Sequence, residues 1–432
     1  MRHVRAISRE TVLVPGLFLS VVFLVATWLA PSTTEAQQSA GITVFEGARL
    51  IVGDGSTPIE NSAFIVQNNR FAAIGRRGQV NVPAGAVRVD LTGKTVMPAI
   101  IDTHKHLAGD RETLVDQLQQ FAYYGVGAVM SLGQDAGDLA FQVRAQVIPG
   151  AALLRSAGRG ITGPEPGRTE IPYWITTEAE ARKAVQELAT KKVDFVKIWV
   201  DDRNGAYKKL TPALYSAVID EAHKNNLRAT AHIFTLDDAK GLLRAGLDAF
   251  AHGVRDKDID DELIAMFKQR PNVVVVPNLP DRGVRTDLSW LNKTVAAKEL
   301  AELQAASTDR PAVQQTFGIQ ARNLAKLSAA GVRIALGTDG GATWAPHAEM
   351  EDMVAAGMTP AQVIVAATRN SAELMKLSDA GTVAAGKSAD FIVLDANPLE
   401  NITNTRRIAS VYLRGGAIDR TALSARWIGG QK

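Results

Sequence analysis

The middle of the chain alternates short apolar runs with longer amphipathic runs, and this alternation constrains the fold more than any other feature of the sequence. Strand-like runs that are each followed by a helical run indicate βα units and a parallel sheet. Eight such units over about 280 residues match the size of a (β/α)8, TIM-type barrel of the α/β class. The eight predicted strands are Thr95–Thr103, Ala128–Leu132, Ala152–Ser156, Phe195–Val200, Arg228–Ile233, Ala249–His252, Val273–Pro277 and Arg333–Gly337.

An open, doubly wound α/β sheet is the alternative architecture. Such a sheet would carry a glycine-rich phosphate loop after its first strand. His104-Lys105-His106 stands at that place instead, which favours the barrel.

The two flanks of this region have a different texture, with β-like runs separated by Gly, Asp and Asn turns. We expect the runs between residues 42 and 98 to form an antiparallel sheet, and those of both flanks to pair into one small β-sandwich domain. The predicted limits are 37–98 and 379–432 for the two parts of this domain and 99–378 for the barrel.

The first residues resemble an export signal. Arg2, Arg5 and Arg9 precede a 20-residue apolar run, and the small residues Thr34 and Ala36 end the polar stretch that follows. This pattern predicts a signal peptide over residues 1–36 and a periplasmic or secreted protein. An uncleaved membrane anchor is the alternative, because a run of 20 residues is long for a signal peptide.

The chain contains no cysteine, which excludes disulfides and thiolate metal sites. Its formal net charge of +3 is too small to indicate a nucleic-acid partner. The remaining expectation is chemistry on a small-molecule substrate by His, carboxylate, Lys, Ser, Thr or Tyr side chains, or by a metal held by nitrogen and oxygen. The composition leaves a homo-oligomer open.

Potential metal ligands recur at the ends of the predicted strands. Active sites of (β/α)8 barrels assemble at the carboxyl ends of the strands, so we expect these side chains to converge. Imidazole and carboxylate are ligands of zinc and similar divalent ions. A buried lysine with a lowered pKa can react with carbon dioxide to form an anionic carbamate, which could bridge two ions. The six residues are His104, His106, Lys197, His232, His252 and Asp339.

The run from Val96 to His106 resembles the first-strand signature of the metal-dependent amidohydrolase superfamily. The resemblance extends through the other predicted ligands to the tail between Gly381 and Asp390, about residues 42–425, and is strongest for the imidazolonepropionase-like and Xaa-Pro-dipeptidase-like branch. It implies two zinc ions: His104, His106 and Asp339 would bind the buried one, His232 and His252 the exposed one, and carboxylated Lys197 would bridge them. One departure is Ala99, where a glycine is usual.

The predicted activity is hydrolysis of an amide or peptide C–N bond in a dipeptide or N-acyl amino acid. A metal-activated hydroxide would attack the carbonyl, and Asp339 would carry the proton to the leaving group. Two alternatives remain: a one-metal hydrolase of cyclic amides or imidazolones, and a periplasmic binding protein that keeps the fold without turnover.

Substrate contacts are predicted from side chains near the strand ends. The segment 161–175, after the third strand, is rich in Gly and Pro and is expected either to cover the site or simply to connect two elements. His347, after the eighth strand, is expected either to cap a helix or to touch substrate. The candidates are Arg168, Tyr173, Trp174 and His347, with Arg159, Arg255 and Trp344 as further ones.

Overall fold

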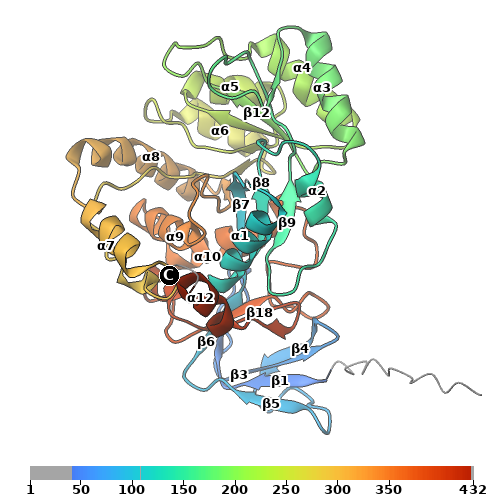
Figure 1. Ribbon diagram of the computed structural model, residues 1–432, viewed down its shortest axis with the longest axis vertical. Helices are drawn as coiled ribbons and strands as arrows, with labels where there is room; N and C mark the ends of the chain where they lie inside the picture. The colour runs from blue at the N-terminus through green and yellow to red at the C-terminus, as the bar shows by residue number, and fades with distance from the viewer. Residues whose placement is uncertain (1–40, 108, 430–432) are drawn as a thin grey trace, which may run out of the picture. The chain divides into compact units, whose positions relative to one another are not determined.

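The computed structural model describes residues 41–107 and 109–429, so the predicted signal peptide over residues 1–36 lies outside the described residues. Two parallel sheets form the centre of this region (Figure 1). One has the order β7-β8-β9 and the other includes β12-β13-β14-β15-β16. Their strands are β7 Ile100–Lys105, β8 Val126–Ser131, β9 Leu153–Ser156, β12 Val196–Val200, β13 Ala229–Ile233, β14 Ala249–Phe250, β15 Val274–Val275 and β16 Arg333–Ile334.

Backbone hydrogen bonds connect the two parallel sheets at two places. Asp194 N donates to Ser156 O at 2.9 Å, next to β9 and β12, and Thr103 N donates to Leu336 O at 2.9 Å, next to β7 and β16. The second of these bonds holds the carboxyl ends of the first parallel strand, β7, and the last, β16, side by side. The result is an α/β fold with parallel sheets, as the alternation predicts.

Helices follow most of these strands, and several begin at a capping residue. Thr177 and Glu180 form a capping box at the start of α3, and the Thr211 side chain accepts from Leu214 N at the start of α4. The apolar side chains of α3 lie on one face and are buried, which fixes that face against the sheet. The helices are α1 Arg111–Tyr123, α2 Leu139–Arg144, α3 Glu178–Thr190, α4 Pro212–Lys224, α5 Leu236–Arg244, α6 Asp261–Gln269, η1 Ser289–Leu291, α7 Ala297–Ala306, α8 Pro311–Ala329, α9 Ala345–Ala355, α10 Pro360–Val365, η2 Ala366–Asn370, α11 Ser371–Leu374, η3 Ile402–Arg406 and α12 Arg420–Gly429.

Strands from both flanks form two small sheets, of order β4-β3-β1-β5 and β19-β18-β17-β6-β2. β6 pairs with β17, so the two flanks of the chain meet in one sheet (Figure 1). The expected antiparallel pairing holds for β1 with β3 and for β3 with β4, but both sheets are mixed, because β1 pairs with β5 and β2 with β6 in parallel. The strands are β1 Thr43–Glu46, β2 Arg49–Leu50, β3 Ser62–Gln67, β4 Arg70–Arg76, β5 Val87–Asp90, β6 Thr95–Pro98, β17 Phe391–Leu394, β18 Ile408–Leu413 and β19 Gly416–Ala417.

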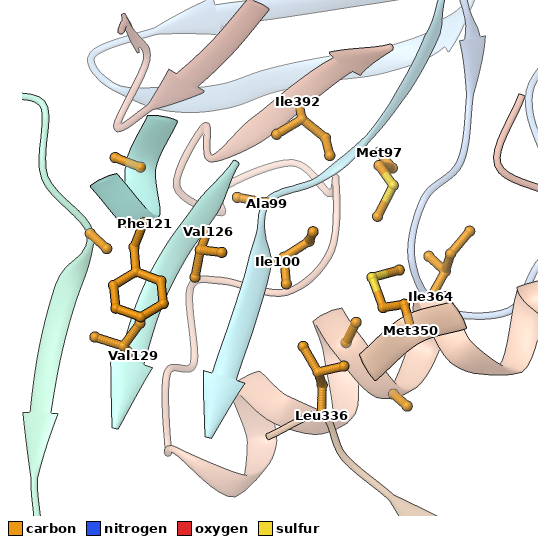
Figure 2. Close-up of a cluster of buried hydrophobic side chains, with 14 of the residues drawn as sticks. Met97, Ala99, Ile100, Phe121, Val126, Val129, Leu336, Met350, Ile364 and Ile392 are labelled. Atoms are coloured by element: carbon orange, nitrogen blue, oxygen red, sulfur yellow. The ribbon is translucent and has the colours of Figure 1, made fainter. Parts of the chain in front are cut away.

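The predicted strand Thr95–Thr103 is two strands that belong to different sheets. Ala99 N donates to Asp390 O at 3.0 Å, whereas Ile100 N donates to Gly125 O at 2.9 Å, so the backbone changes partners at Ala99. Both sides of the junction are buried, and Met97, Ile100 and Ile392 pack in one apolar cluster there (Figure 2). Because the residues on both sides of Ala99 are buried and apolar, the sequence pattern does not indicate where one strand ends and the next begins.

The domain limits 37–98, 99–378 and 379–432 stay predictions. Within residues 41–107 and 109–429, no helix combines the length and apolarity needed to cross a bilayer.

Candidate metal centre

Five of the predicted ligands lie at or after the carboxyl ends of parallel strands, and Lys197 is the second residue of β12. His104 and Lys197 lie within β7 and β12, His232 lies in β13, and His252 and Asp339 follow β14 and β16. His106 follows β7 by one residue. Ligand atoms of His104, His106 and Asp339 all lie within 4.8 Å of one another, close enough to bind one ion.

Asp339 is the centre of this cluster. Its Oδ1 lies 2.9 Å from His106 Nε2 and 3.4 Å from His104 Nε2, and its Oδ2 lies 3.5 Å from His252 Nε2. Lys197 Nζ is 3.4 Å from His104 Nε2. The rings of His232 and His252 are in contact, with centroids 4.4 Å apart. The structure therefore brings all six predicted ligands into one neighbourhood.

The backbone of Asp339 adopts the left-handed conformation, with φ of 57°. This conformation is costly for a residue with a side chain and is typical of functional sites. Asp339 N donates to His104 O at 2.7 Å, which ties the turn directly to the metal-ligand strand.

Asp102, to which the sequence reasoning assigned no role, holds the turn of Asp339 through hydrogen bonds to Thr338. It is fully buried, and its carboxylate accepts from Thr338 Oγ1 at 2.7 Å, from Thr338 N at 3.2 Å and from His104 N at 3.1 Å. One carboxylate thus joins the strand that carries the histidines to the turn that carries Asp339. Its position two residues before His104, on the same strand, was the feature of the sequence that could have indicated this role.

Lys105 also went unassigned, although it stands between the two histidines. It is fully buried, and its Nζ donates to Gly340 O and, at 3.3 Å, to Ala342 O. Since side chains alternate along a strand, Lys105 points away from the histidine face and reaches the loop after Asp339. Asp102 and Lys105 therefore hold the turn of Asp339 at two points.

Burial and charge set the protonation of the cluster. Burial lowers the pKa of His104 and His252 well below the usual value, so both rings are neutral, the form that binds metals. Burial raises the pKa of Asp339, but His104, His106 and Lys197 outweigh it, and the net pKa lies well below the usual range. Burial lowers the pKa of Lys197 to about 7, against the partial compensation of Asp339. A neutral Lys197 amine is therefore available near neutral pH.

The contacts of each ring show which nitrogen is left for a metal. His104 Nδ1 lies 3.0 Å from Ala251 O, so its Nε2 faces the cluster. His232 Nε2 lies 2.9 Å from Asp201 Oδ2, which leaves Nδ1 as the ring nitrogen available to a metal ion. A histidine whose other ring nitrogen is held by a carboxylate is typical of metal sites. Asp201 was missed, although it directly follows the strand of Lys197.

The donor set fits a divalent ion. Among the described residues, His106 Nδ1 and both ring nitrogens of His252 are buried and make no hydrogen bond. Buried polar atoms are normally paired, so unpaired imidazole nitrogens around a carboxylate point to a missing partner. A divalent cation would supply that partner.

Unlike the predicted metal ligands, the predicted substrate residues do not form one cluster and make separate contacts. Strands β10 Ile161–Thr162 and β11 Tyr173–Trp174 continue the sheet of β12, so the segment 161–175 is attached to the sheet at both ends. Arg168 donates to the buried Glu165 at 2.6 Å, and the Arg159 guanidinium lies 3.9 Å from the Tyr173 ring centroid. The Trp174 indole nitrogen is buried without a hydrogen-bond partner in the described region.

His347 is fully buried in α9, and both of its ring nitrogens have partners. Nε2 lies 2.9 Å from Tyr124 O and Nδ1 lies 3.0 Å from Thr405 Oγ1. These contacts favour a structural role for His347, and its role in substrate binding stays a prediction.

A cavity of about 430 Å³ reaches the turn of Asp339, although none of the six predicted ligands lines it. It is lined by Thr338, which precedes Asp339, and by Leu279, which follows Asn278; Asn278 lies 2.7 Å from His104 Nδ1. A small molecule in this cavity would therefore be next to the turn of Asp339.

Two curated proteins are similar in sequence to most of this chain. The chain is 26% identical over 393 residues to an imidazolonepropionase from Deinococcus radiodurans, which covers 83% of this chain and 92% of the relative. It is 23% identical to ochratoxinase from Aspergillus niger, over 86% of this chain and 85% of the relative.

Solved structures of two further proteins have a similar fold over most of this chain. A provisionally named prolidase from Bifidobacterium longum superposes with a TM-score of 0.73 at 26% identity, over 89% of this chain and 98% of the other. A Xaa-Pro dipeptidase with bound methionine superposes with a TM-score of 0.70 at 20% identity, over 87% and 99%. The model of the Amidohydrolase family matches residues 95–418, three quarters of the sequence. The chain therefore belongs to the Amidohydrolase family and is a hydrolase of that superfamily.

Proposed function

We propose that this protein is a metal-dependent hydrolase that cleaves an amide or peptide C–N bond in a dipeptide or an N-acyl amino acid. The observation that carries the proposal is the cluster of His104, His106 and Asp339, whose ligand atoms lie within 4.8 Å of one another. The prolidase and dipeptidase names among its structural relatives support the choice of substrate class.

Two divalent ions, zinc by preference, are proposed for the site. His104, His106 and Asp339 would hold one ion, and His232 and His252 the other. When bound, the ions would lower the pKa of a water molecule and polarise the substrate carbonyl.

Lys197 is proposed to bridge the ions as a carbamate. Its pKa of about 7 leaves a large fraction of neutral amine near neutral pH. The amine nitrogen would form a bond to the carbon of carbon dioxide and lose one proton, giving an anion with two oxygens. The carbamate would replace a positive charge among the ligands by a negative one, which favours metal binding.

Asp339 is proposed to move the proton of the reaction. Its carboxylate would accept a proton from the attacking water and deliver it to the leaving nitrogen when the C–N bond breaks. Asp102 and Lys105 would keep its turn in the left-handed conformation during this transfer. Their contacts to Thr338, Gly340 and Ala342 support that role.

A one-metal hydrolase of cyclic amides or imidazolones is the second candidate. Two observations favour it: within the described residues one three-ligand group reaches 4.8 Å, and a relative is an imidazolonepropionase. A binding protein without turnover would keep the same cluster and hydrolyse nothing.

One experiment separates these candidates. Purified, metal-replete protein is assayed on a panel of dipeptides, N-acyl amino acids, cyclic amides and imidazolones, and its metal content is measured. Hydrolysis of the first two classes with about two metal equivalents supports the proposal. Selective hydrolysis of the cyclic compounds with about one equivalent supports the second candidate, and no hydrolysis by metal-loaded protein contradicts both.

We further propose that the eight parallel strands form a closed (β/α)8 barrel, supported by the backbone hydrogen bonds that join the two parallel sheets at two places. The flanking sheets are proposed to form a β-sandwich. The protein is proposed to be exported to the periplasm or secreted, on the pattern of residues 1–36, and to be anchored in the membrane only if that segment is retained. Its partner is proposed to be a small molecule and not nucleic acid. Amino-terminal sequencing of the exported protein tests the cleavage after Ala36.

A further inference from the structure

Glu165 is a buried carboxylate in the segment 161–175, and two arginines hold it. Arg168, from the same segment, donates to its Oε2 at 2.6 Å. Arg203, from the loop after β12, donates through Nε to its Oε1 at 3.2 Å. A buried carboxylate is costly unless charge-assisted hydrogen bonds offset its desolvation, so both contacts fix its position. The pair of Glu165 and Arg203 therefore connects the segment 161–175 to the loop after β12.

The guanidinium group of Arg203 is bound at two of its edges. While Nε donates to Glu165, Nη1 donates to Asp201 Oδ2 at 2.7 Å, and the backbone N of Arg203 donates to Asp201 Oδ1 at 2.9 Å. The backbone of Arg203 is left-handed, with φ of 56°, a conformation that is unfavourable for a residue with a side chain. Because a planar group bound at two edges has one orientation, Glu165 determines how Arg203 meets Asp201.

Asp201 Oδ2 is shared between Arg203 and a predicted metal ligand. His232 Nε2 lies 2.9 Å from this oxygen, and Arg203 Nη1 lies 3.1 Å from the same ring nitrogen. An arginine released from Glu165 could turn toward Asp201 and pair with both of its oxygens, since bidentate pairing is favourable. That pairing would displace the imidazole from Oδ2. Glu165 prevents it by holding the Nε edge of the guanidinium away from Asp201.

We infer that Glu165 is a positioning residue of the metal centre. It acts through Arg203 and Asp201, and it keeps the ring of His232 oriented with Nε2 protonated and Nδ1 open to a metal ion. The inference rests on the proposed function in taking His232 as a metal ligand. It goes beyond that function because it gives the segment 161–175 a role in metal binding.

The test measures the zinc affinity of metal-replete protein by competition with a chelator. Glu165→Gln removes the charge with little change of size. We expect it to weaken binding of the more weakly held zinc equivalent about 3- to 10-fold, less than the loss for a direct outer partner of a ligand. Glu165→Asp should recover part of this affinity. Glu170→Gln, the same change at an exposed residue of the same segment, should match the parent.

A double variant separates positioning from a general structural effect. In Asp201→Asn the connection to His232 is already weakened, so adding Glu165→Gln should lower the zinc affinity by less than about 2-fold. Arg203→Lys keeps the charge but reaches one carboxylate at a time. It should show the same loss as Glu165→Gln, and it carries the test if Glu165→Gln does not fold.

A second measurement does not need the metal. NMR of metal-free protein with isotope-labelled imidazole rings should show His232 with its proton on Nε2 in the parent. In Glu165→Gln we expect a mixture of both tautomers. The His232→Gln variant identifies the signals.

Unchanged zinc affinity in Glu165→Gln overturns the inference, and so does an unchanged tautomer of His232. An equal loss for both zinc equivalents, or a full additional loss in the double variant, also overturns it, because either would show a general structural effect. Hydrolysis of panel substrates by Glu165→Gln with unchanged zinc affinity leaves the proposed function standing without the positioning role. A changed tautomer in a protein that binds no zinc contradicts the proposed function and leaves the positioning role standing.

Discussion

The two halves of the candidate metal centre differ in how their charge is arranged. The first half, His104, His106 and Asp339, contains its own carboxylate, which lies within 3.4 Å of both histidines. The second half, His232 and His252, has two guanidinium groups within 3.2 Å of His232 Nε2. The first half thus has a carboxylate between its two histidines, whereas the second half shares Asp339, whose Oδ2 lies 3.5 Å from His252 Nε2.

Position in the sheet explains the difference. The first half joins β7 and the turn after β16, whose backbones are hydrogen-bonded to each other, and the turn delivers a carboxylate directly onto the histidines. The second half comes from β13 and β14, which pair side by side, and the nearest carboxylate, Asp201, faces the outer nitrogen of His232. Lys197 lies next to the first half and is the residue whose modification would complete the second.

The largest expected effect is on Asp339, which belongs to the first half. Asp339→Asn keeps the size of the side chain but removes the proton acceptor, so we expect turnover to fall about 10²- to 10⁴-fold with metal retained. The kcat on the best panel substrate and the metal content are the measurements. Asp258→Asn, at an exposed ion pair with Arg322, is the control. An unchanged kcat would remove Asp339 as the proton carrier.

Lys197 tests whether the second half depends on a carbamate. In Lys197→Ala we expect metal content to fall from about two equivalents to about one and most activity to be lost. Added acetate or propionate should restore part of it, because a free carboxylate can replace the missing bridge. Lys197→Arg, which cannot form a carbamate, should show the same loss. Two retained metals and full activity in Lys197→Ala would refute the bridge.

Asp201 tests the orientation of His232 in the second half. Asp201→Asn weakens the hydrogen bond to Nε2, and we expect a 10- to 100-fold lower metal affinity, roughly the loss seen for outer partners of metal ligands. Competition with a chelator measures it, and the more weakly held equivalent should be the one affected. Asp202→Asn is the neighbouring control, since the Asp202 carboxylate accepts from Gly205 N at 3.1 Å, within its own loop. Equal affinities in both variants would show that Asp201 does not orient the ring.

The smallest effect on activity is expected at His347, which lies outside both halves. Burial lowers its pKa from 6.5 to about 4 in the folded protein. Between these values the unfolded chain binds the proton first, so His347 contributes stability that is complete above pH 6.5 and is lost as the pH falls towards 4. The loss at pH 5 is about 2 kcal/mol in the free energy of unfolding.

Urea denaturation of the parent protein and of His347→Gln at pH 7.5 and pH 5 measures this contribution. The glutamine variant should lose less stability on acidification than the parent, by the amount that His347 contributes, with turnover at neutral pH nearly unchanged. Identical pH dependence in the two proteins would contradict the structural role. A large fall in turnover would instead support the predicted substrate contact.

Helix limits are marked more locally in the sequence than strand limits. A capping box and an amphipathic period mark α3, Glu178–Thr190, within its own residues. The strand Thr95–Thr103 was wrong, because hydrogen-bond partners outside the run decide where one sheet ends. The strand β5, Val87–Asp90, was missed, since it is mostly exposed and lacks an apolar pattern.

The residues that hold the site were also hidden in the sequence. Asp102, Lys105 and Asp201 lie beside predicted ligands, but an acidic or basic residue in a sequence is usually a solvated one. Their roles follow from burial and from contacts across long stretches of chain, such as Thr338 Oγ1 to Asp102 over 236 residues. The local pattern of apolar and polar residues does not predict contacts between residues so far apart in the sequence.

The sequence by itself determined which side chains could meet, because βα alternation places the carboxyl ends of parallel strands at one edge and five of the six predicted ligands stand at or after those ends. The tertiary structure alone decided which ring nitrogens face the cluster and which carboxylate orients His232. Those properties depend on distances of a few ångströms between strands. Electrostatic and hydrogen-bond energies change steeply over such distances, while the strand pattern does not change at all.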